Sequence, residues 1–91
     1  MPVIARFCGI VIRLLQLRAL GTRLHAFHGD SEMVVDLASL RIIQGDASER
    51  ESRLVMAWAR EHQHQLLAGW WRSSAGRRAL AMAPAARSCL T

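Results

Sequence analysis

The chain has 91 residues, of which 52% are hydrophobic, and its formal net charge is +5. This length fits one domain, and the hydrophobic content is enough for a packed core, so the composition argues against a disordered chain. All twelve basic residues are arginines, whereas the seven acidic residues lie between Asp30 and Glu61. The acid-free ends could contact nucleic acid, an anionic surface or an acidic protein, or carry a charge excess without a specific partner.

No segment is expected to cross a membrane. Arginines at positions 6, 13 and 18 interrupt residues 3–20, the most apolar run. The run also lacks the uninterrupted apolar region and the cleavage site of a signal peptide, although it resembles an Arg-rich presequence in composition. We therefore expect a cytoplasmic protein that does not contact a membrane. Cys8 and Cys89 could bridge the two ends of the chain, but in the cytoplasm we expect reduced thiols.

The first half of the chain is predicted to form strands. Residues 6–15 contain three consecutive β-branched residues, which favour a strand, and Gly9 within this run suggests a bulge. Residues 16–24 have weaker signals, and the chain could turn at Gly21 or continue as a short helix.

Turn residues then divide the sequence into further short strands. Gly29, Asp30 and Ser31 form a turn signal, and β-rich residues follow from 33 to 37 and from 41 to 44. These segments predict three or four antiparallel strands in total.

The longest predicted element is a helix within residues 45–71. Ser48 and Glu51 have the spacing of a capping box, in which the hydroxyl accepts a backbone N–H of the first turn. Apolar residues then recur every three or four positions, which is the helical period. The stripe consists of Leu54, Val55, Trp58, Ala59, His62, Leu66 and Trp70. The segment from Ser73 to Gly76 is expected to end the helix.

These elements predict an α+β fold with a small antiparallel sheet of three or four strands packed against one long C-terminal helix. Residues 1–76 are expected to form a single domain. Residues 77–91 are expected to form a basic, Ala-rich tail that is loosely attached.

Two histidines are candidate catalytic residues. His25 and His28 could supply acid–base groups, and Asp30 lies close to them in sequence. Because strand residues three apart point to opposite faces, the pair does not form a metal site, and a surface histidine is the alternative for His25. His62 falls on the apolar stripe of the helix and is interpreted as a packed core residue. We predict no metal site and no cofactor.

Arginines and a tryptophan are candidate binding residues. Arg13, Arg18 and Arg23 could hold the phosphates of a nucleic acid. Trp71 lies about 100° around the helix from Trp70, so it could be exposed and fill a pocket of a partner protein, with packing at the core edge as the alternative. Trp70 is expected in the core with the other stripe residues.

Three segments together resemble a small bacterial family, domain of unknown function 4160. They are MPVIARFCGIVIR, MVVDL with RIIQG, and RLVMAWAREHQHQLLAGW, and the resemblance covers about residues 1–84. Members typically begin MPTISRFYGIVIRMYF, contain an HNPPHFHA segment and end on a helix of the type RLVxEWAxxHxxELxxNW. The resemblance implies a small cytosolic protein that binds a partner protein encoded nearby, in a two-gene arrangement like that of toxin–antitoxin pairs.

The chain departs from this family pattern over residues 14–24. Ala19 stands where the first family histidine is usual, Gly21 and Thr22 replace the two prolines, and Arg23 replaces the middle histidine. His25 and Ala26 remain. If that loop is the working site of the family, this chain has lost most of it.

Three hypotheses for function follow. The first is a non-catalytic interaction module that presents an edge strand or Trp71 to another protein. The second is a nucleic-acid-binding or RNA-cleaving protein of toxin type that uses His25 and the nearby arginines. The third is a degraded or partly frameshifted family member without function.

A compensated frameshift would explain a contiguous change between intact flanks. If codons 14–24 were shifted, one alternative reading frame of the gene will encode a Pro-Pro-His-like string across them. Translation of both shifted frames tests this hypothesis, and it fails if neither frame contains such a string.

Overall fold

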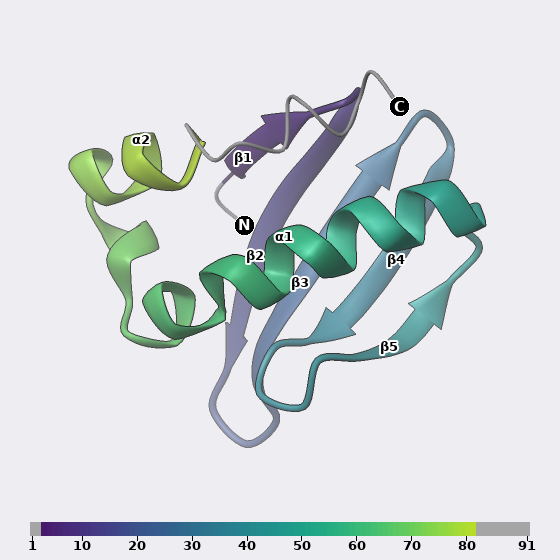
Figure 1. Ribbon diagram of the computed structural model, residues 1–91. Helices are drawn as coiled ribbons and strands as arrows, with labels where there is room; N and C mark the ends of the chain where they lie inside the picture. The colour runs from purple at the N-terminus through teal and green to yellow at the C-terminus, as the bar shows by residue number, and fades with distance from the viewer. Residues whose placement is uncertain (1–2, 82–91) are drawn as a thin grey trace.

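The computed structural model describes residues 3–81, which form one antiparallel sheet with helices packed on it (Figure 1). The elements are β1 (Val3–Phe7), β2 (Ile10–Leu17), β3 (Gly21–His28), β4 (Ser31–Asp36), β5 (Arg41–Gly45), α1 (Glu49–Leu67), the 3₁₀ helix η1 (Trp70–Arg72) and α2 (Ser74–Ala81). The strands neighbour one another in chain order, from β1 to β5. The predicted α+β class is confirmed, but the sheet has five strands instead of three or four, and α2 follows the long helix.

The additional strand arises at the first hairpin. Residues 6–15 were predicted to form one strand with a bulge, whereas β1 and β2 are two strands joined at Cys8 and Gly9. These residues have φ angles of 55° and 77°. Positive φ at both central positions is the geometry of a tight two-residue hairpin turn. Cysteine is not a usual turn residue, so no strong local signal marks the reversal of the chain.

Residues 16–24, the segment with the weakest signals, complete a second hairpin and do not form a helix. The pairing of β2 with β3 is regular from Val11 opposite Phe27 to Leu17 opposite Gly21. Gly21 has a φ angle of 83°, which a residue with a side chain adopts only with strain.

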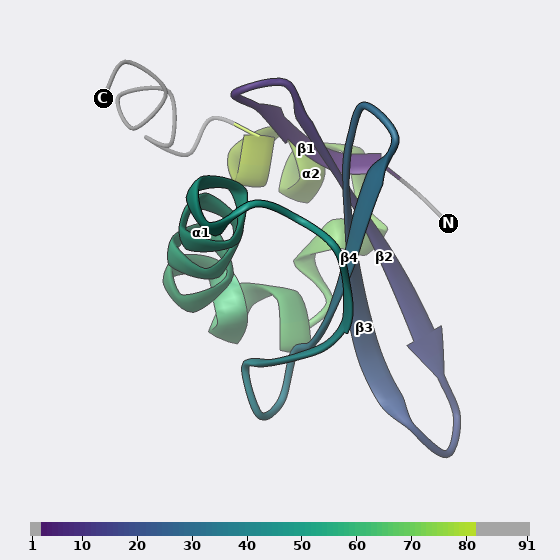
Figure 2. The same ribbon diagram turned by 90° about the vertical axis from the view of Figure 1, so that its right-hand side faces the viewer.

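One face of the sheet packs on α1, and the other face is uncovered by the described helices. Figure 2 shows α1 and α2 on the same side of the sheet. Alternate residues of the central strands therefore point into the core, and they are Ile10, Ile12, Leu14, Leu24, Ala26, Met33 and Val35. We call the opposite face the open face. Its residues on the three central strands are Val11, Arg13, Leu15, Leu17, Arg23, His25, Phe27, Glu32, Val34 and Asp36.

The predicted helix begins where its cap signal indicates and ends earlier than expected. Ser48 Oγ accepts a hydrogen bond from the backbone N–H of Glu51 at 3.1 Å. The helix α1 ends at Leu67, because Gly69 adopts the left-handed conformation with φ 88°. Trp70 consequently lies in η1, outside the regular period that the apolar stripe assumed.

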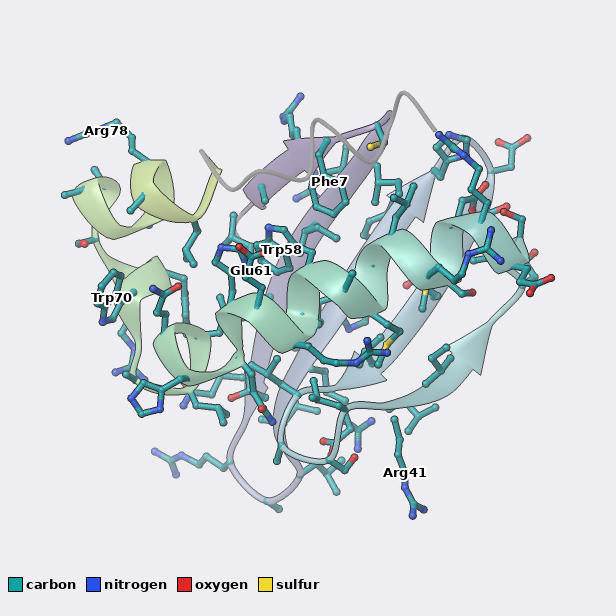
Figure 3. All side chains as sticks on the ribbon, in the orientation of Figure 1. Phe7, Arg41, Trp58, Glu61, Trp70 and Arg78 are labelled. Carbon is teal, nitrogen blue, oxygen red and sulfur yellow. The ribbon has the colours of Figure 1, made fainter. Side chains whose placement is uncertain are left out.

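The centre of the core is an aromatic stack beneath α1. Trp58 is 1% exposed, its ring centroid lies 6.0 Å from that of Phe7, and the His62 ring lies 4.7 Å away on the same helix. In Figure 3 the side chains of Phe7 and Trp58 meet between α1 and the first hairpin. His62 Nδ1 lies 3.0 Å from the backbone oxygen of Trp58, which fits a donated hydrogen bond. The interpretation of His62 as a packed residue is confirmed.

The fold continues beyond the predicted domain boundary at residue 76. The helix α2 crosses this position, and Leu80 is completely buried in the core. Residues 77–81 are therefore part of the packed structure, and the rest of the predicted tail lies outside the described residues. Cys8 takes part in a disulfide, so the expectation of a reduced thiol is wrong for this residue, and Cys89 lies outside the described residues.

Removal of the Trp58 side chain is expected to destabilise the protein strongly. Truncation of a buried aromatic residue costs about 3–5 kcal/mol, so Trp58→Ala should lower the thermal unfolding midpoint far more than Trp70→Ala. Trp70 is 47% exposed, and surface substitutions usually change stability by about 0.5 kcal/mol or less. Circular dichroism melting curves test this, with Trp58→Phe as an intermediate variant that keeps a ring. Equal midpoints for the two alanine variants would contradict this view of the core.

Candidate functional site

His25 occupies the centre of the open face. The strand register places it between Arg13 on β2 and Val34 on β4. Its Nδ1 lies 3.1 Å from Glu32 Oε1, and its ring centroid lies 6.4 Å from that of Phe27 with an angle of 19° between the planes. Two contacts thus hold the imidazole in place on a surface that no described helix covers.

Two of the three candidate arginines accompany His25. Arg23 lies opposite Leu15 and Asp36 in the sheet, so it is the diagonal neighbour of Arg13, roughly 7–8 Å away between Cα atoms. The Nε of Arg23 has no hydrogen-bond acceptor among the described residues. Arg18, by contrast, lies in the exposed turn between β2 and β3. The fold therefore gathers Arg13, Arg23 and His25 and leaves Arg18 at the hairpin tip.

Asp36 is a further member of the open face that the sequence analysis did not identify. Its carboxylate accepts hydrogen bonds from the hydroxyl and the backbone N–H of Ser39 at 2.6 Å and 3.1 Å. These bonds, and secondarily the positive charge of Arg23, lower the pKa of Asp36 below its ordinary value of 3.8. The Asp36 carboxylate is therefore hydrogen-bonded to Ser39 in the turn after β4, although Asp36 lies opposite Arg23 in the sheet.

The other candidate catalytic histidine, His28, points to the α1 side of the sheet. Its Nδ1 lies 2.9 Å from Glu51 Oε1, so it joins the end of β3 to the first turn of α1. A Cβ added to Gly9 would lie 3.3 Å from the His28 ring, which shows how closely the first hairpin approaches it. His25 and His28 are on opposite faces and cannot act together on one reacting bond.

The two adjacent tryptophans have different environments, with Trp71 packed at the core edge and Trp70 exposed. Trp71 is half-buried against the core, and its Nε1 donates to the backbone oxygen of Leu66 at 3.1 Å. Arg72 lies over the Trp71 ring, 5.3 Å from its centroid. Trp70, expected in the core, is the exposed member of the pair and projects from η1 in Figure 3. Trp71 thus packs at the core edge, and its role in binding a partner stays a prediction.

The strand β5 is exposed along its whole length. It forms one edge of the sheet, and Ile42 and Ile43 are 48% and 45% exposed. The pairing with β4 shifts between Gln44 and Ile42, so Ile43 is the extra residue of a bulge. The sequence indicated a strand here, but the position at the sheet edge depends on the pairing of all five strands.

The described residues offer one further basic concavity. A cleft of about 410 Å³ lies between β1 and α2 and is lined partly by Arg6, Arg77 and Arg78. Arg77 already donates to the backbone oxygen of Trp71 at 2.9 Å. Within residues 3–81, no group of three metal-ligating side chains is placed to hold an ion.

Hydropathy gives no transmembrane assignment to this part of the chain. None of the helices described is both long enough and apolar enough to span a bilayer.

These features define a small α+β protein with a five-stranded meander, a helix across one face and a second face that carries Arg13, Arg23 and His25. The sequence model of the family described as a domain of unknown function, DUF4160, matches residues 9–71. The chain belongs to this family, as its sequence motifs suggested. No curated protein matches the chain. No solved structure matches it either.

The segment that departs from the family pattern is fully integrated in the fold. Leu14 and Leu24 face each other across β2 and β3 and are almost completely buried in the core. Thr22, which stands for a family proline, is also buried at the start of β3. Whatever the origin of residues 14–24, their pattern of apolar residues suits a hairpin of this sheet.

Loss of the Ser39 hydroxyl should raise the pKa of Asp36 towards its ordinary value. The folded-state pKa is lowered, so the stabilisation is complete at pH values above 3.8 and is lost as the pH falls through the lowered pKa. Ser39→Ala should therefore be less stable than the wild type at neutral pH, and the difference should shrink in acid. Carboxyl NMR titration and urea unfolding at several pH values test this. A difference that persists unchanged once Asp36 is protonated would contradict the assignment.

Proposed function

We propose that this protein is a non-catalytic protein-interaction module, one half of a toxin–antitoxin-like two-gene pair, and that it binds its partner at the β5 edge. The observation that carries the proposal is the exposure of two adjacent isoleucines, Ile42 and Ile43, on an edge strand. Exposed apolar side chains next to unpaired backbone groups are a common site for association with another chain.

The bulge in β5 determines which groups would contribute most to binding. Ile42 pairs with Val35 and points to the α1 side, while the extra residue Ile43 is displaced from the regular ladder. A bulge interrupts a straight row of edge hydrogen-bonding groups, so continuous addition of a sixth strand is hindered. The two isoleucine side chains are therefore the expected anchors, filling an apolar pocket of the partner.

Charge favours a different, acidic protein over a second copy of this chain. The net charge is +5, so two copies would repel each other. Arg41 begins β5, opposite Asp36, and its side chain projects outward from β5, beyond the sheet, in Figure 3. A partner segment with acidic residues flanking an apolar centre would complement this edge.

The RNA-cleaving and the degraded alternatives have weaker support from the geometry. An RNA-cleaving protein that uses His25 and His28 would need both groups at one site, but they lie on opposite faces of the sheet. A degraded product without function would not be expected to place Leu14 and Leu24 in a closed core. A cytoplasmic location is part of the proposal, because the family resemblance implies a small cytosolic protein, although the disulfide at Cys8 is unusual in that compartment.

Substitution of the edge isoleucines should abolish partner binding. Ile43→Lys places a charge in the proposed apolar contact and should weaken co-purification with the product of the adjacent gene at least about tenfold. Leu67→Lys is the matched control, because Leu67 is also exposed, at 50%, but lies at the end of α1. The untagged partner should be quantified after co-expression from the native operon.

The outcomes of this experiment separate the hypotheses. Retention of the partner by Leu67→Lys and its loss by Ile43→Lys supports the β5 edge. Equal behaviour of the two variants excludes this edge as the interface. A strictly monomeric protein without any operon partner would refute the interaction module itself, and a homodimer in sedimentation analysis would identify a second copy as the occupant.

A further inference from the structure

The open face combines two rings with several cationic side chains. Open-face positions on β1 and β5 add Arg6, which is opposite Val11 and also lines the cleft against α2, and Arg41, which is opposite Asp36. Four arginines thus share this face with the carboxylates of Glu32 and Asp36. Glu32 contacts His25, and Asp36 is bonded to Ser39, so both carboxylates have partners on the protein. The face therefore has an excess of positive charge.

The rings of His25 and Phe27 form a platform. Residues two apart on a strand lie roughly 6.7 Å from each other on one face, and the centroid separation here is 6.4 Å. With only 19° between their planes, the two rings are stacked. The contact with Glu32 fixes the His25 ring, whose side chain is 16% exposed, and Val11, opposite Phe27, adds apolar surface. A flat aromatic ligand can extend such a stack without requiring a pocket.

Arg13 and Arg23 flank this platform on the side of the second hairpin. Arg13 lies directly opposite His25, and Arg23 precedes His25 by two residues on β3. The Nε of Arg23 is buried and lacks an acceptor among the described residues, so Arg23 offers a phosphate its positive charge and not this donor. Cations beside stacking rings are the combination that binds phosphates and unpaired bases together.

We infer that the open face binds single-stranded nucleic acid, with a base on the His25–Phe27 platform and phosphates at Arg13 and Arg23. Base edges receive no dedicated polar pocket, so the binding has little sequence preference. RNA and DNA share the required chemistry, and a 2′-hydroxyl contact would distinguish them. This function is separate from the proposed β5 contact, because it uses side chains of the central strands on the open face.

Fluorescence anisotropy with a labelled 12-nucleotide poly-U RNA tests this inference, with the complete chain at 50 and 200 mM salt. Arg23→Ala should weaken binding about tenfold and reduce the salt slope by about one unit, because one phosphate contact is lost. Phe27→Leu keeps apolar bulk but removes the ring, and it should weaken binding about fivefold or more. The matched control is Arg60→Ala, which removes the same charge from the exposed side of α1. Circular dichroism confirms the fold of each variant.

Binding measurements with other ligands distinguish between the possible occupants of the open face. Binding of poly-U or of the matching single-stranded DNA, in either case stronger than that of the duplex, supports the inference. Absence of binding at 50 mM salt overturns it, as does an equal loss in Arg60→Ala, which would indicate charge attraction without a site. Equal binding of duplex, or tighter binding of poly-glutamate with the same sensitivity to Arg23→Ala, also overturns it. Ile43→Lys should retain RNA binding, so failure of the β5 proposal is recognised independently.

Discussion

The packing of Trp58 between α1 and the first hairpin is the contact on which the rest of the structure depends. Its indole packs beside the Phe7 ring. The His62 ring, on the same helix, also stacks on the indole. A sheet of five short strands has one face that must be buried, and α1 supplies the apolar stripe that buries it. The contact between His28 Nδ1 and Glu51 Oε1 then fixes the start of the helix over β3.

This one-sided packing gives the protein two different surfaces. Because α1 and α2 both lie on one face, the side chains of the other face can be polar without loss of core (Figure 2). Arg13, Arg23 and His25 occupy positions where apolar residues would be needed if a second layer were present. The meander also leaves β5 at an edge, where Ile42 and Ile43 are exposed. Both binding proposals are therefore consequences of the same arrangement.

The segment that departs from the family pattern is part of the sheet and of the core. Residues 14–24 replace a His- and Pro-rich segment, yet they pair regularly and contribute Leu14 and Leu24 to the core. Arg23 and His25 stand at family histidine positions and lie on the open face, on the same side of the strand. The site of this chain is thus basic and aromatic at positions where the family pattern has two histidines.

Local signals were sufficient for several elements. The capping box at Ser48 and the stripe through Trp58 and His62 located the helix, because both depend on groups within a few residues of each other. The turn at Gly29 located the hairpin of β3 and β4 for the same reason. The first hairpin was not predicted, because Cys8 adopts a positive φ angle and cysteine is not a residue type that signals one.

The sequence by itself determined the α+β class, the family and the separation of His25 from His28, because strand periodicity assigns alternate residues to opposite faces. Tertiary structure decided what no local pattern contains. It placed Arg13 opposite His25, exposed Trp70 and left β5 at an edge. The first and third features depend on strand pairing, and hence on contacts between residues that are distant in sequence. The exposure of Trp70 depends on the end of the helix at Gly69, and hence on one backbone angle.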